Sequence, residues 1–294
     1  MTILWRKPHV EIAPHLEAIV ERALEVAGDA ALAYPRPSGD WMDPKPRPKI
    51  MAYVRKVAKE TSNAHVSLAT LDDAQSFALE YAAFLPGWID GTFGRSPRGH
   101  ASYLQVTLPR AQLYERAEAM CTWFAELLAL VPFSAATLGL ALEGHYGQVY
   151  PRALEHRALD ISHMSCVTYD IGNAVHGIGW LTALGDDVVS RLGGEAKLAQ
   201  TLGPAGSVTK VTGGLVVALG DQPSRGSTED ELAPYRRLAG FLGDELHVPR
   251  SVSYFTCAFA DGSARYGGRE EAMQEAWHRR FVIEHGELVR IFSP

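Results

Sequence analysis

Residues 149–194 read VYPRALEHRALDISHMSCVTYDIGNAVHGIGWLTALGDDVVSRLGG, and they join two parts of the chain with similar patterns. Within this stretch, 178–183 is predicted to be a strand. The order strand, strand, long helix occurs before it, at 77–131, and after it, at 208–247. We therefore expect an α+β fold, with mixed or antiparallel sheets flanked by two long amphipathic helices. The repeated order is interpreted as two pseudo-repeated strand–strand–helix modules, with coincidence as the alternative.

The two long helices have the clearest periodicity in the chain. After Pro109, apolar residues recur every third or fourth position as far as Val131. Thr228 followed by Glu231 is typical of a capping box, which predicts the start of the second helix. Further helices are predicted over 12–27, 50–59, 150–159, 186–192, 195–202 and 269–280, and further strands over 65–71, 77–84, 101–108, 137–142, 208–212, 214–219, 252–259 and 288–292.

Length and charge set the broad class of the protein. A chain of 294 residues with 47% hydrophobic and 21% charged residues can bury a large core, as one domain over 1–294 or as halves 1–148 and 149–294. The net charge of −6 argues against direct nucleic-acid binding, for which a basic stripe is expected. It fits a protein partner with a basic face.

The cysteines and the apolar pattern indicate a compartment. Cys121, Cys166 and Cys257 are far apart and odd in number, which suits a reducing environment rather than a disulfide framework. The first residues contain no apolar run of signal-peptide length, and no segment approaches a membrane span. We expect a cytoplasmic protein that does not bind a membrane.

One possible catalytic group lies in the joining stretch. Cys166, His176 and Asp170 are the residue types of a Cys–His–Asp nucleophilic set. Spacing alone does not establish such a set, since its members must meet in space. Free cysteines are usually small buried hydrophobes. We therefore favour a packed junction and keep the enzyme as the alternative.

Metal and cofactor motifs are weak. His156, Asp160 and His163 have residue types that bind metals, but eleven histidines produce such spacings by chance. The segment GIGWLTALG (177–185) begins like a dinucleotide fingerprint, yet Thr182 replaces its third glycine, and a strand through the motif fits better. We expect no metal and no cofactor.

Acidic turns and tryptophans in two loops are the candidate partner-binding residues. Carboxylates in turns usually face solvent or helix N-termini, but some of them can guide a basic partner. Tryptophan is typical of the residues that dominate interface energetics. The candidates are Trp41, Asp43, Asp72, Asp73, Trp88, Asp186, Asp187, Glu229, Asp230 and Glu231.

Several segments, in order, resemble a bacterial family. The chain is similar to type VI secretion immunity proteins, a former domain-of-unknown-function family associated with immunity to VRR-Nuc nuclease effectors. The segments are LVPFSAATLGLALEG (130–144), YPRALEHRALDI (150–161), GIGWLTALGDDVVSRLGG (177–194), GGLVVALGDQP (213–223), DELAPYRRLAGFLGDEL (230–246) and W-x-R-R-F from Trp277 to Phe281.

The resemblance implies an immunity protein rather than an enzyme. Such a protein binds a cognate toxin, type VI secreted or delivered by a related contact-dependent route, and occludes its active site. A nuclease is the toxin that the family suggests, encoded by an adjacent gene. The family provides no catalytic residue. The proline-rich segment 33–49 and the tail beyond Phe281 match it least, and variable loops are where partner specificity is expected.

Two other function classes remain open at this point. The first is an enzyme that uses Cys166, His176 and Asp170, or a metal at His156, Asp160 and His163. The second is a structural subunit of a phage- or secretion-related assembly, which would form a ring or a filament.

Overall fold

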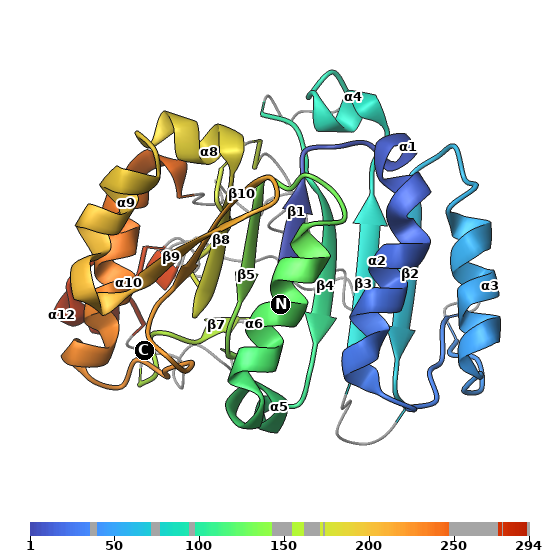
Figure 1. Cartoon of the computed structure of the whole chain (residues 1–294), viewed down its shortest axis with the longest axis horizontal. Helices are drawn as coiled ribbons and strands as arrows, with labels where there is room; N and C mark the ends of the chain where they lie inside the picture. The colour runs from blue at the N-terminus through green and yellow to red at the C-terminus, as the bar shows by residue number, and fades with distance from the viewer. Residues whose placement is uncertain are drawn as a thin grey trace.

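The structure is a computed structural model that describes residues 1–35, 40–71, 77–93, 98–142, 155–161, 171–172, 174–246, 276–277 and 279–292. Eight strands in these residues form one sheet with the order β2-β3-β4-β1-β5-β8-β10-β9, and each neighbouring pair is antiparallel (Figure 1). The strands are β1 (Thr2–Trp5), β2 (Ala64–Ala69), β3 (Ala78–Ala83), β4 (Ser102–Thr107), β5 (Ala135–Leu138), β8 (Leu181–Gly185), β9 (Ser207–Val211) and β10 (Gly214–Ala218).

A second, two-stranded sheet pairs β6 (Ala141–Leu142) with β7 (Asp160–Ile161) in parallel. The helices of the described residues lie on both faces of the large sheet. They are α1 (His9–Ile12), α2 (Leu16–Ala23), α3 (Arg47–Val57), α4 (Pro86–Ile89), α5 (Arg110–Glu115), α6 (Ala117–Leu128), α8 (Asp186–Arg191), α9 (Glu195–Leu202), α10 (Glu229–Leu242) and α12 (His285–Phe292).

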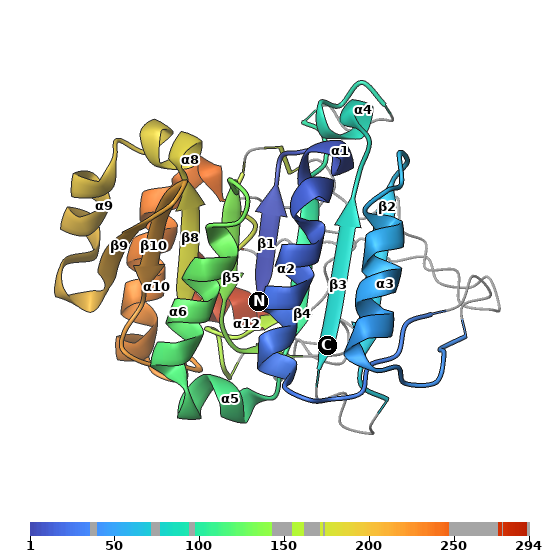
Figure 2. The same ribbon diagram turned by 45° about the vertical axis from the view of Figure 1, so that its right-hand side comes forward.

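One face of the sheet is covered by α2, α3 and α6, which Figure 2 shows in front of the strands. Ile3 and Leu104 from central strands pack there with Ile19, Val54 and Phe124 in one buried cluster. Each of these side chains is at most 1% exposed. Burying a side chain of this size contributes roughly 1.5–3 kcal/mol, so this layer is a main source of stability.

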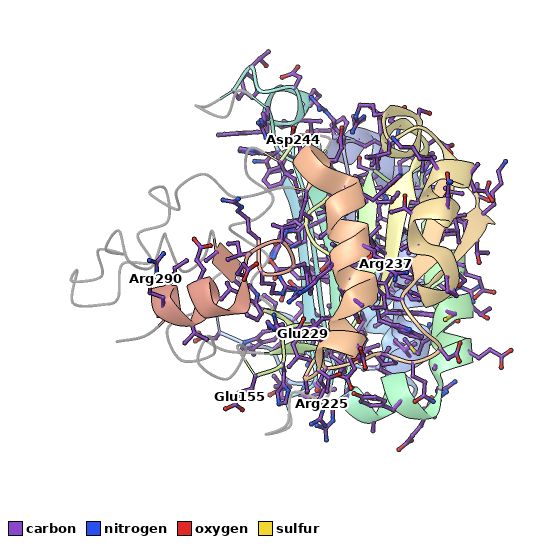
Figure 3. All side chains as sticks on the ribbon, turned by 90° about the vertical axis from the view of Figure 1, so that its left-hand side faces the viewer. Glu155, Arg225, Glu229, Arg237, Asp244 and Arg290 are labelled. Atoms are coloured by element: carbon purple, nitrogen blue, oxygen red, sulfur yellow. The ribbon has the colours of Figure 1, made fainter. Side chains whose placement is uncertain are left out.

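The opposite face, over β8 and β10, is covered by α10 (Figure 3). Leu184, Leu215 and Val217 pack against Tyr235 and Leu238 in a second buried cluster. The two longest helices, α6 and α10, therefore lie on opposite faces of the same sheet. The interpretation as two pseudo-repeated modules stays a prediction.

Strand β1 lies at the centre of the sheet. It pairs with β4 on one side and with β5 on the other. Its residues Ile3, Leu4 and Trp5 are 1–2% exposed. Because β5 pairs in turn with β8, strands from residues 1–148 and 149–294 continue into one another.

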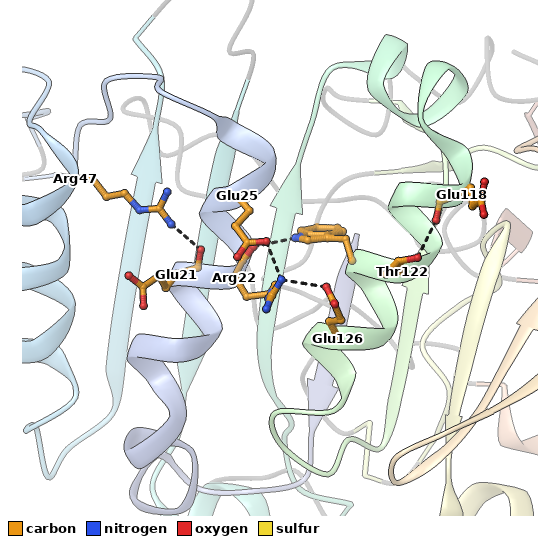
Figure 4. Close-up of polar contacts among 8 residues, drawn as sticks. Glu21, Arg22, Glu25, Arg47, Glu118, Thr122 and Glu126 are labelled. Atoms are coloured by element: carbon orange, nitrogen blue, oxygen red, sulfur yellow. Dashed lines mark hydrogen bonds and ion pairs between the residues drawn. The ribbon is translucent and has the colours of Figure 1, made fainter.

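Arginines connect the helices of the first face (Figure 4). Arg22 of α2 donates to Glu126 of α6 over 3.0 Å, and the Trp123 indole donates to the backbone oxygen of Arg22. Arg55 of α3 donates to Glu17 of α2 over 2.7 Å. Exposed ion pairs contribute little individually, so these contacts fix the spacing of the helices more than they stabilise the fold.

A buried arginine attaches the C-terminal segment to the α10 face. The Arg280 guanidinium lies 4.6 Å from the ring centre of Trp277 and 4.4 Å from that of Phe281. Its Nε donates to the backbone oxygen of Arg157 over 2.8 Å. The Phe281 ring also stacks on Tyr235 of α10 at 5.4 Å.

Most predicted elements are present in the described residues, with four corrections. The strand predicted over 137–142 is divided between β5 and β6, which belong to different sheets, because the chain leaves the large sheet after Leu138. The residues predicted as a strand at 288–292 belong to helix α12, because Leu288 is the buried position of an amphipathic turn, not of an alternating strand. The helix predicted over 109–131 is interrupted at Arg116, whose φ of −131° and ψ of 34° are not helical. Residues 155–159 of the helix predicted over 150–159 form turns. The strand predicted at 252–259 lies outside the described residues, as do residues 269–275 and 278 of the helix predicted at 269–280.

We predict opposite stability effects for two glycine substitutions. A Cβ on Gly214 would come within 2.1 Å of the Leu184 carbonyl oxygen of the paired strand, whereas one on Gly240 meets nothing within 4 Å. Gly214→Ala should therefore lower the free energy of unfolding by about 1–3 kcal/mol. Gly240→Ala, inside α10, should raise it by about 0.5–1 kcal/mol. Urea denaturation measures both, and equal effects would contradict the packing described for β8 and β10.

Stability should also fall in mild acid because of His9. This side chain is buried, and its Nε2 donates to the Val57 carbonyl while Nδ1 accepts from the Tyr81 hydroxyl at 2.9 Å. Burial lowers the pKa of His9 below its usual 6.5. The unfolded chain therefore binds a proton first, and unfolding becomes easier as pH falls below about 6.5, by up to about 1.4 kcal/mol per pH unit from this group. In His9→Gln this component of the pH dependence should be missing. If the free energy of unfolding of the variant and of the unchanged protein falls equally steeply below pH 6.5, the role assigned to His9 is refuted.

Candidate functional site

The sheet has two ends with different surfaces. At the upper end in Figure 1, β1, β3 and β8 finish and helices α1, α4 and α8 follow them. At the lower end, β10 finishes and α10 begins. Figure 3 shows Glu229 and Asp244 at opposite ends of α10, so carboxylates are present at both ends of the sheet.

An aromatic group projects from the upper end at α4. We call Phe84, Trp88, Phe93 and His100 the aromatic knob. The Trp88 and His100 rings are stacked, with centres 5.2 Å apart and planes at 17°. Phe93 meets Trp88 edge-on at 6.3 Å, and Phe84 meets His100 edge-on at 5.5 Å. These edge-to-face and stacked arrangements are favourable geometries for aromatic pairs.

Backbone contacts around two glycines fix the knob. The amide of His100 donates to the Trp88 carbonyl over 2.8 Å, and the amide of Phe93 donates to the Gly87 carbonyl over 2.7 Å. A Cβ on Gly87 would overlap the Phe93 ring at 2.4 Å. Gly99 has a φ of 76°, and a Cβ there would lie 2.0 Å from the Ile89 carbonyl oxygen. The knob is therefore preorganised, which reduces the entropy lost when a partner binds.

Two apolar side chains at this end remain open to solvent. Phe93 is 50% exposed, and Val10 of α1 is 68% exposed. Helices α1 and α4 are held close together because the His9 amide donates to the Phe84 carbonyl over 2.9 Å. Exposed apolar residues on a fixed projection are typical of protein interaction sites.

Asp186 and Asp187 also lie at the upper end, in the first turn of α8. Both are exposed. The Asp186 amide donates to the Gly213 carbonyl over 3.0 Å, and the Gly185 amide donates to the Ser134 carbonyl over 2.9 Å. Neither carboxylate forms an ion pair in the part of the chain that the structure describes. The backbone that carries both carboxylates is therefore fixed, and both side chains are exposed, although Asp187 also attracts Arg191 electrostatically.

The acidic residues at the start of α10 are largely used within the chain. Glu229 forms ion pairs with Arg157 and, over 2.8 Å, with Arg236. Glu231 accepts from the Ser227 amide over 2.7 Å. Thr228 accepts from the Glu231 amide at the N-cap, as predicted, so these contacts form the expected capping arrangement.

The bond from Ser227 lowers the pKa of Glu231 below its usual 4.5. Asp230 is exposed beside Glu229 and Glu231. Of the three predicted carboxylates, Asp230 is the one that forms no ion pair and no capping hydrogen bond with the described residues. The lower end is therefore a weaker candidate for partner binding than the upper end.

Trp41 and Asp43 lie away from both acidic groups, beyond the edge strand β2. Trp41 forms an isolated antiparallel β-bridge with Pro35. Ala33, in the same segment, forms another with Ala69 at the lower end of β2. Trp41 is 43% exposed. The structure does not bring these two residues together with Trp88, and the predicted set is dispersed over the molecule.

The other predicted site residues are only partly covered. Asp72, Asp73, His163, Cys166 and Asp170 lie outside the described residues. His176 is 6% exposed, and His156 shares a hydrogen bond of 2.9 Å with Ser227. Asp160 lies in β7. Among the described residues, no three His, Cys, Asp or Glu side chains are arranged to hold a metal ion, and none of the helices there is long and apolar enough to cross a membrane.

Sequence reasoning did not identify Phe93 or Val10. Phe93 lies in a Gly- and Arg-rich loop where no periodicity marks it. Val10 adjoins the apolar pattern of the first helices and resembles a core position. The order Gly-Trp-x-x-Gly-x-Phe at 87–93 was the available indication, because glycines beside aromatic residues permit close ring packing.

A comparison with family models assigns most of the chain to one family. A family model described as TsiV, type VI immunity for VRR-NUC, matches residues 28–281. No curated protein matches. Among solved structures, the Pseudomonas aeruginosa T6SS protein PA0821 is similar, with a TM-score of 0.73 and 14% identity over 99% of this chain and 85% of that chain. At this identity, the likeness shows a shared fold.

We predict that Glu231 acts as a structural residue. Glu231→Gln should lower the free energy of unfolding by about 0.5–1 kcal/mol at neutral pH, because it weakens the cap of α10. Since the pKa of Glu231 is lowered in the folded chain, the difference from the unchanged protein should shrink as pH falls below 4.5. Asp230→Asn is the matched control and should change stability by less than about 0.5 kcal/mol. Equal losses in the two variants would contradict the assigned roles.

Proposed function

We propose, from the premise that this chain belongs to the family of type VI immunity proteins for VRR-NUC, that it binds a cognate VRR-Nuc-type nuclease effector and blocks its active site. The upper end of the sheet makes the contact. The family match covers residues 28–281 and includes both the aromatic knob and the start of α8.

The observation that carries the proposal is the knob. Phe93 and Trp88 present aromatic surface on a backbone fixed by Gly87 and Gly99, so binding requires little further ordering. Buried aromatic anchors in rigid positions contribute most of the energy of many protein interfaces. They mainly slow dissociation, which is what an inhibitor of a toxic enzyme requires.

The charges at the same end suit a nuclease partner. A nuclease holds the phosphate groups of its substrate with basic side chains. The carboxylates of Asp186 and Asp187 can bind those basic side chains in place of the phosphates. Arg6 and Arg98 lie near the knob, beside Gly172. Asp90 is exposed at the end of α4, so the α4 side has mixed charge, and the paired carboxylates lie on the α8 side. Complementary charge of this kind raises the association rate more than it lowers the dissociation rate.

Inhibition by binding needs no chemistry in this chain. We infer that the protein is not an enzyme, and that it acts in the cytoplasm, where a nuclease effector meets nucleic acid. The toxin gene is expected beside the gene for this chain. The enzyme that uses Cys166, His176 and Asp170 is the runner-up, and rapid thiol labelling at neutral pH would favour it.

The direct test is a titration of the nuclease encoded beside this gene. DNA cleavage by a fixed amount of purified nuclease should fall linearly with added protein and reach background at one protein per nuclease. The two chains should also co-purify at equal stoichiometry. Continued cleavage at a tenfold excess, with no complex at micromolar concentrations, would remove this proposal for the pair.

We predict separate kinetic effects for the two parts of the surface. Phe93→Ser should raise the dissociation rate at least about tenfold, because it removes an anchor at the contact. Asp186→Asn with Asp187→Asn should lower the association rate about threefold to tenfold and weaken its dependence on salt. Surface plasmon resonance with the immobilised nuclease measures both rates.

The matched control is Asp29→Asn with Asp221→Asn, which removes the same charge from exposed positions at the lower end. This control should leave both rate constants within about twofold of the unchanged protein. If it lowers association as much as the upper-end pair, net charge rather than position guides the partner. Normal urea denaturation of each variant confirms that folding is intact.

A further inference from the structure

Strand β9 forms one edge of the eight-stranded sheet, and three of its five residues are exposed. It is last in the strand order and pairs with β10. Ser207, Thr209 and Lys210 are exposed, and Val208 and Val211 are partly buried. At the other edge of the sheet, Ala33 bridges Ala69 of β2. A regular, exposed edge strand is a template for pairing with another chain.

The register of the hairpin decides which backbone groups point outward. A two-residue turn, Thr212–Gly213, joins β9 to β10, and Val211 pairs with Gly214. In such a hairpin the closing pair exchanges two hydrogen bonds, and bonded pairs then alternate along the strand. Thr209 and Ser207 thus point to β10, and the amide and carbonyl groups of Val208 and Lys210 point away from the sheet.

The region beside this edge is fixed. Arg237 of α10 donates to the Leu202 carbonyl at the end of α9 over 3.1 Å, and Figure 3 shows Arg237 on α10 beside α9. Leu198 and Leu202 hold α9 in the buried cluster under α10. In the described residues, no backbone bond outside the β9–β10 pairing is formed by residues 207–211. The outward amide and carbonyl groups of Val208 and Lys210 are therefore fixed in position and form no backbone hydrogen bond with the described residues.

We propose that β9 pairs antiparallel with β9 of a second copy of this chain, which extends the sheet across a two-fold axis at Thr209. In this register, Val208 and Lys210 of one copy exchange both backbone bonds with Lys210 and Val208 of the other. All five residues of the strand are paired. Thr209 lies opposite Thr209, a favourable cross-strand pair.

The charge on Lys210 disfavours one neighbouring register of the self-pairing, and the pairing of all five strand residues favours the register centred on Thr209 over the one centred on Val208. Pairing centred on Lys210 would place two ammonium groups directly opposite, which is destabilising. Pairing centred on Thr209 places each Lys210 opposite a Val208 and leaves both ammonium groups in solvent. The strand is thus complementary to itself without any change in conformation.

The two-fold axis also fixes how the binding surfaces are arranged. Antiparallel pairing reverses the strand direction, so the upper end of one copy lies beside the lower end of the other. The two aromatic knobs point in opposite directions. Each copy can then bind its own partner, which makes the dimer compatible with the proposed function but independent of it.

The first test measures mass by light scattering at increasing concentrations of the full chain. The wild type should approach twice the chain mass of 32.1 kDa. Lys210→Pro removes an outward amide and spares the bonds to β10, so it should raise the dissociation constant of the dimer about tenfold or more. Lys210→Ala keeps that amide and should stay within about threefold of the wild type.

The second test uses disulfide trapping, which reports the register. Thr209→Cys places two cysteines at a non-hydrogen-bonded pair with Cα atoms about 4.5 Å apart, which suits a disulfide. Mild oxidation should therefore yield a covalent dimer. Ser207→Cys is the matched control on the same face, but its two copies lie roughly 14 Å apart and should not cross-link.

The outcomes separate this proposal from the immunity function. A wild type that stays at 32.1 kDa up to high micromolar concentrations overturns it, as does equal cross-linking of the two cysteine variants. A monomeric wild type whose nuclease binding is weakened by Lys210→Pro also overturns it, because the effector then occupies the edge. If the Lys210→Pro variant is monomeric and still inhibits the nuclease completely, the result supports the wild-type dimer and leaves the proposed function intact.

Discussion

The pairing of β1 with both β4 and β5 is the constraint on which the rest of the structure depends. This four-residue strand connects one part of the sheet, with strands β2, β3 and β4, to the other part, with strands β5, β8, β10 and β9. Its side chains alternate between faces, since Ile3 and Trp5 join the core under α2 and α6, while Leu4 packs with Tyr103 on the other side. Both layers of the protein are therefore assembled around the same short segment.

Antiparallel pairing on both sides of β1 also decides what gathers at each end of the sheet. Alternate strands finish at the upper end, so α1, α4 and α8 all begin there although they are far apart in sequence. This places an aromatic knob and a pair of available carboxylates on one end of a rigid sheet. The lower end instead uses its carboxylates for ion pairs and a helix cap. A protein that inhibits by binding needs a fixed surface of the first kind.

Local pattern predicted most elements of the fold but not the central strand. Thr228 and Glu231 cap α10 as expected, because capping depends on neighbours in sequence, and the strands predicted at 65–71 and 77–84 are present as β2 and β3. The segment TILW is too short for periodicity, and its stability comes from pairing with residues about a hundred positions away. Of the predicted partner-binding residues, Trp88, Asp186 and Asp187 lie at the same end of the sheet, and their role in binding stays a prediction. Phe93 and Val10 were missed because exposure is a tertiary property. Glu231 belongs to the cap that the sequence predicts, whereas the ion pair of Glu229 with Arg157 joins residues far apart in sequence and could not be predicted.

The most direct measurement of the central claim is hydrogen–deuterium exchange of this protein, free and in complex with the nuclease encoded beside its gene. The account predicts slower exchange in the complex at 84–93 and 183–190, where the knob and the start of α8 lie. It predicts unchanged exchange at 225–231 and 40–46. Protection confined to the lower end, with the knob unchanged, would contradict the assignment of the upper end as the binding surface.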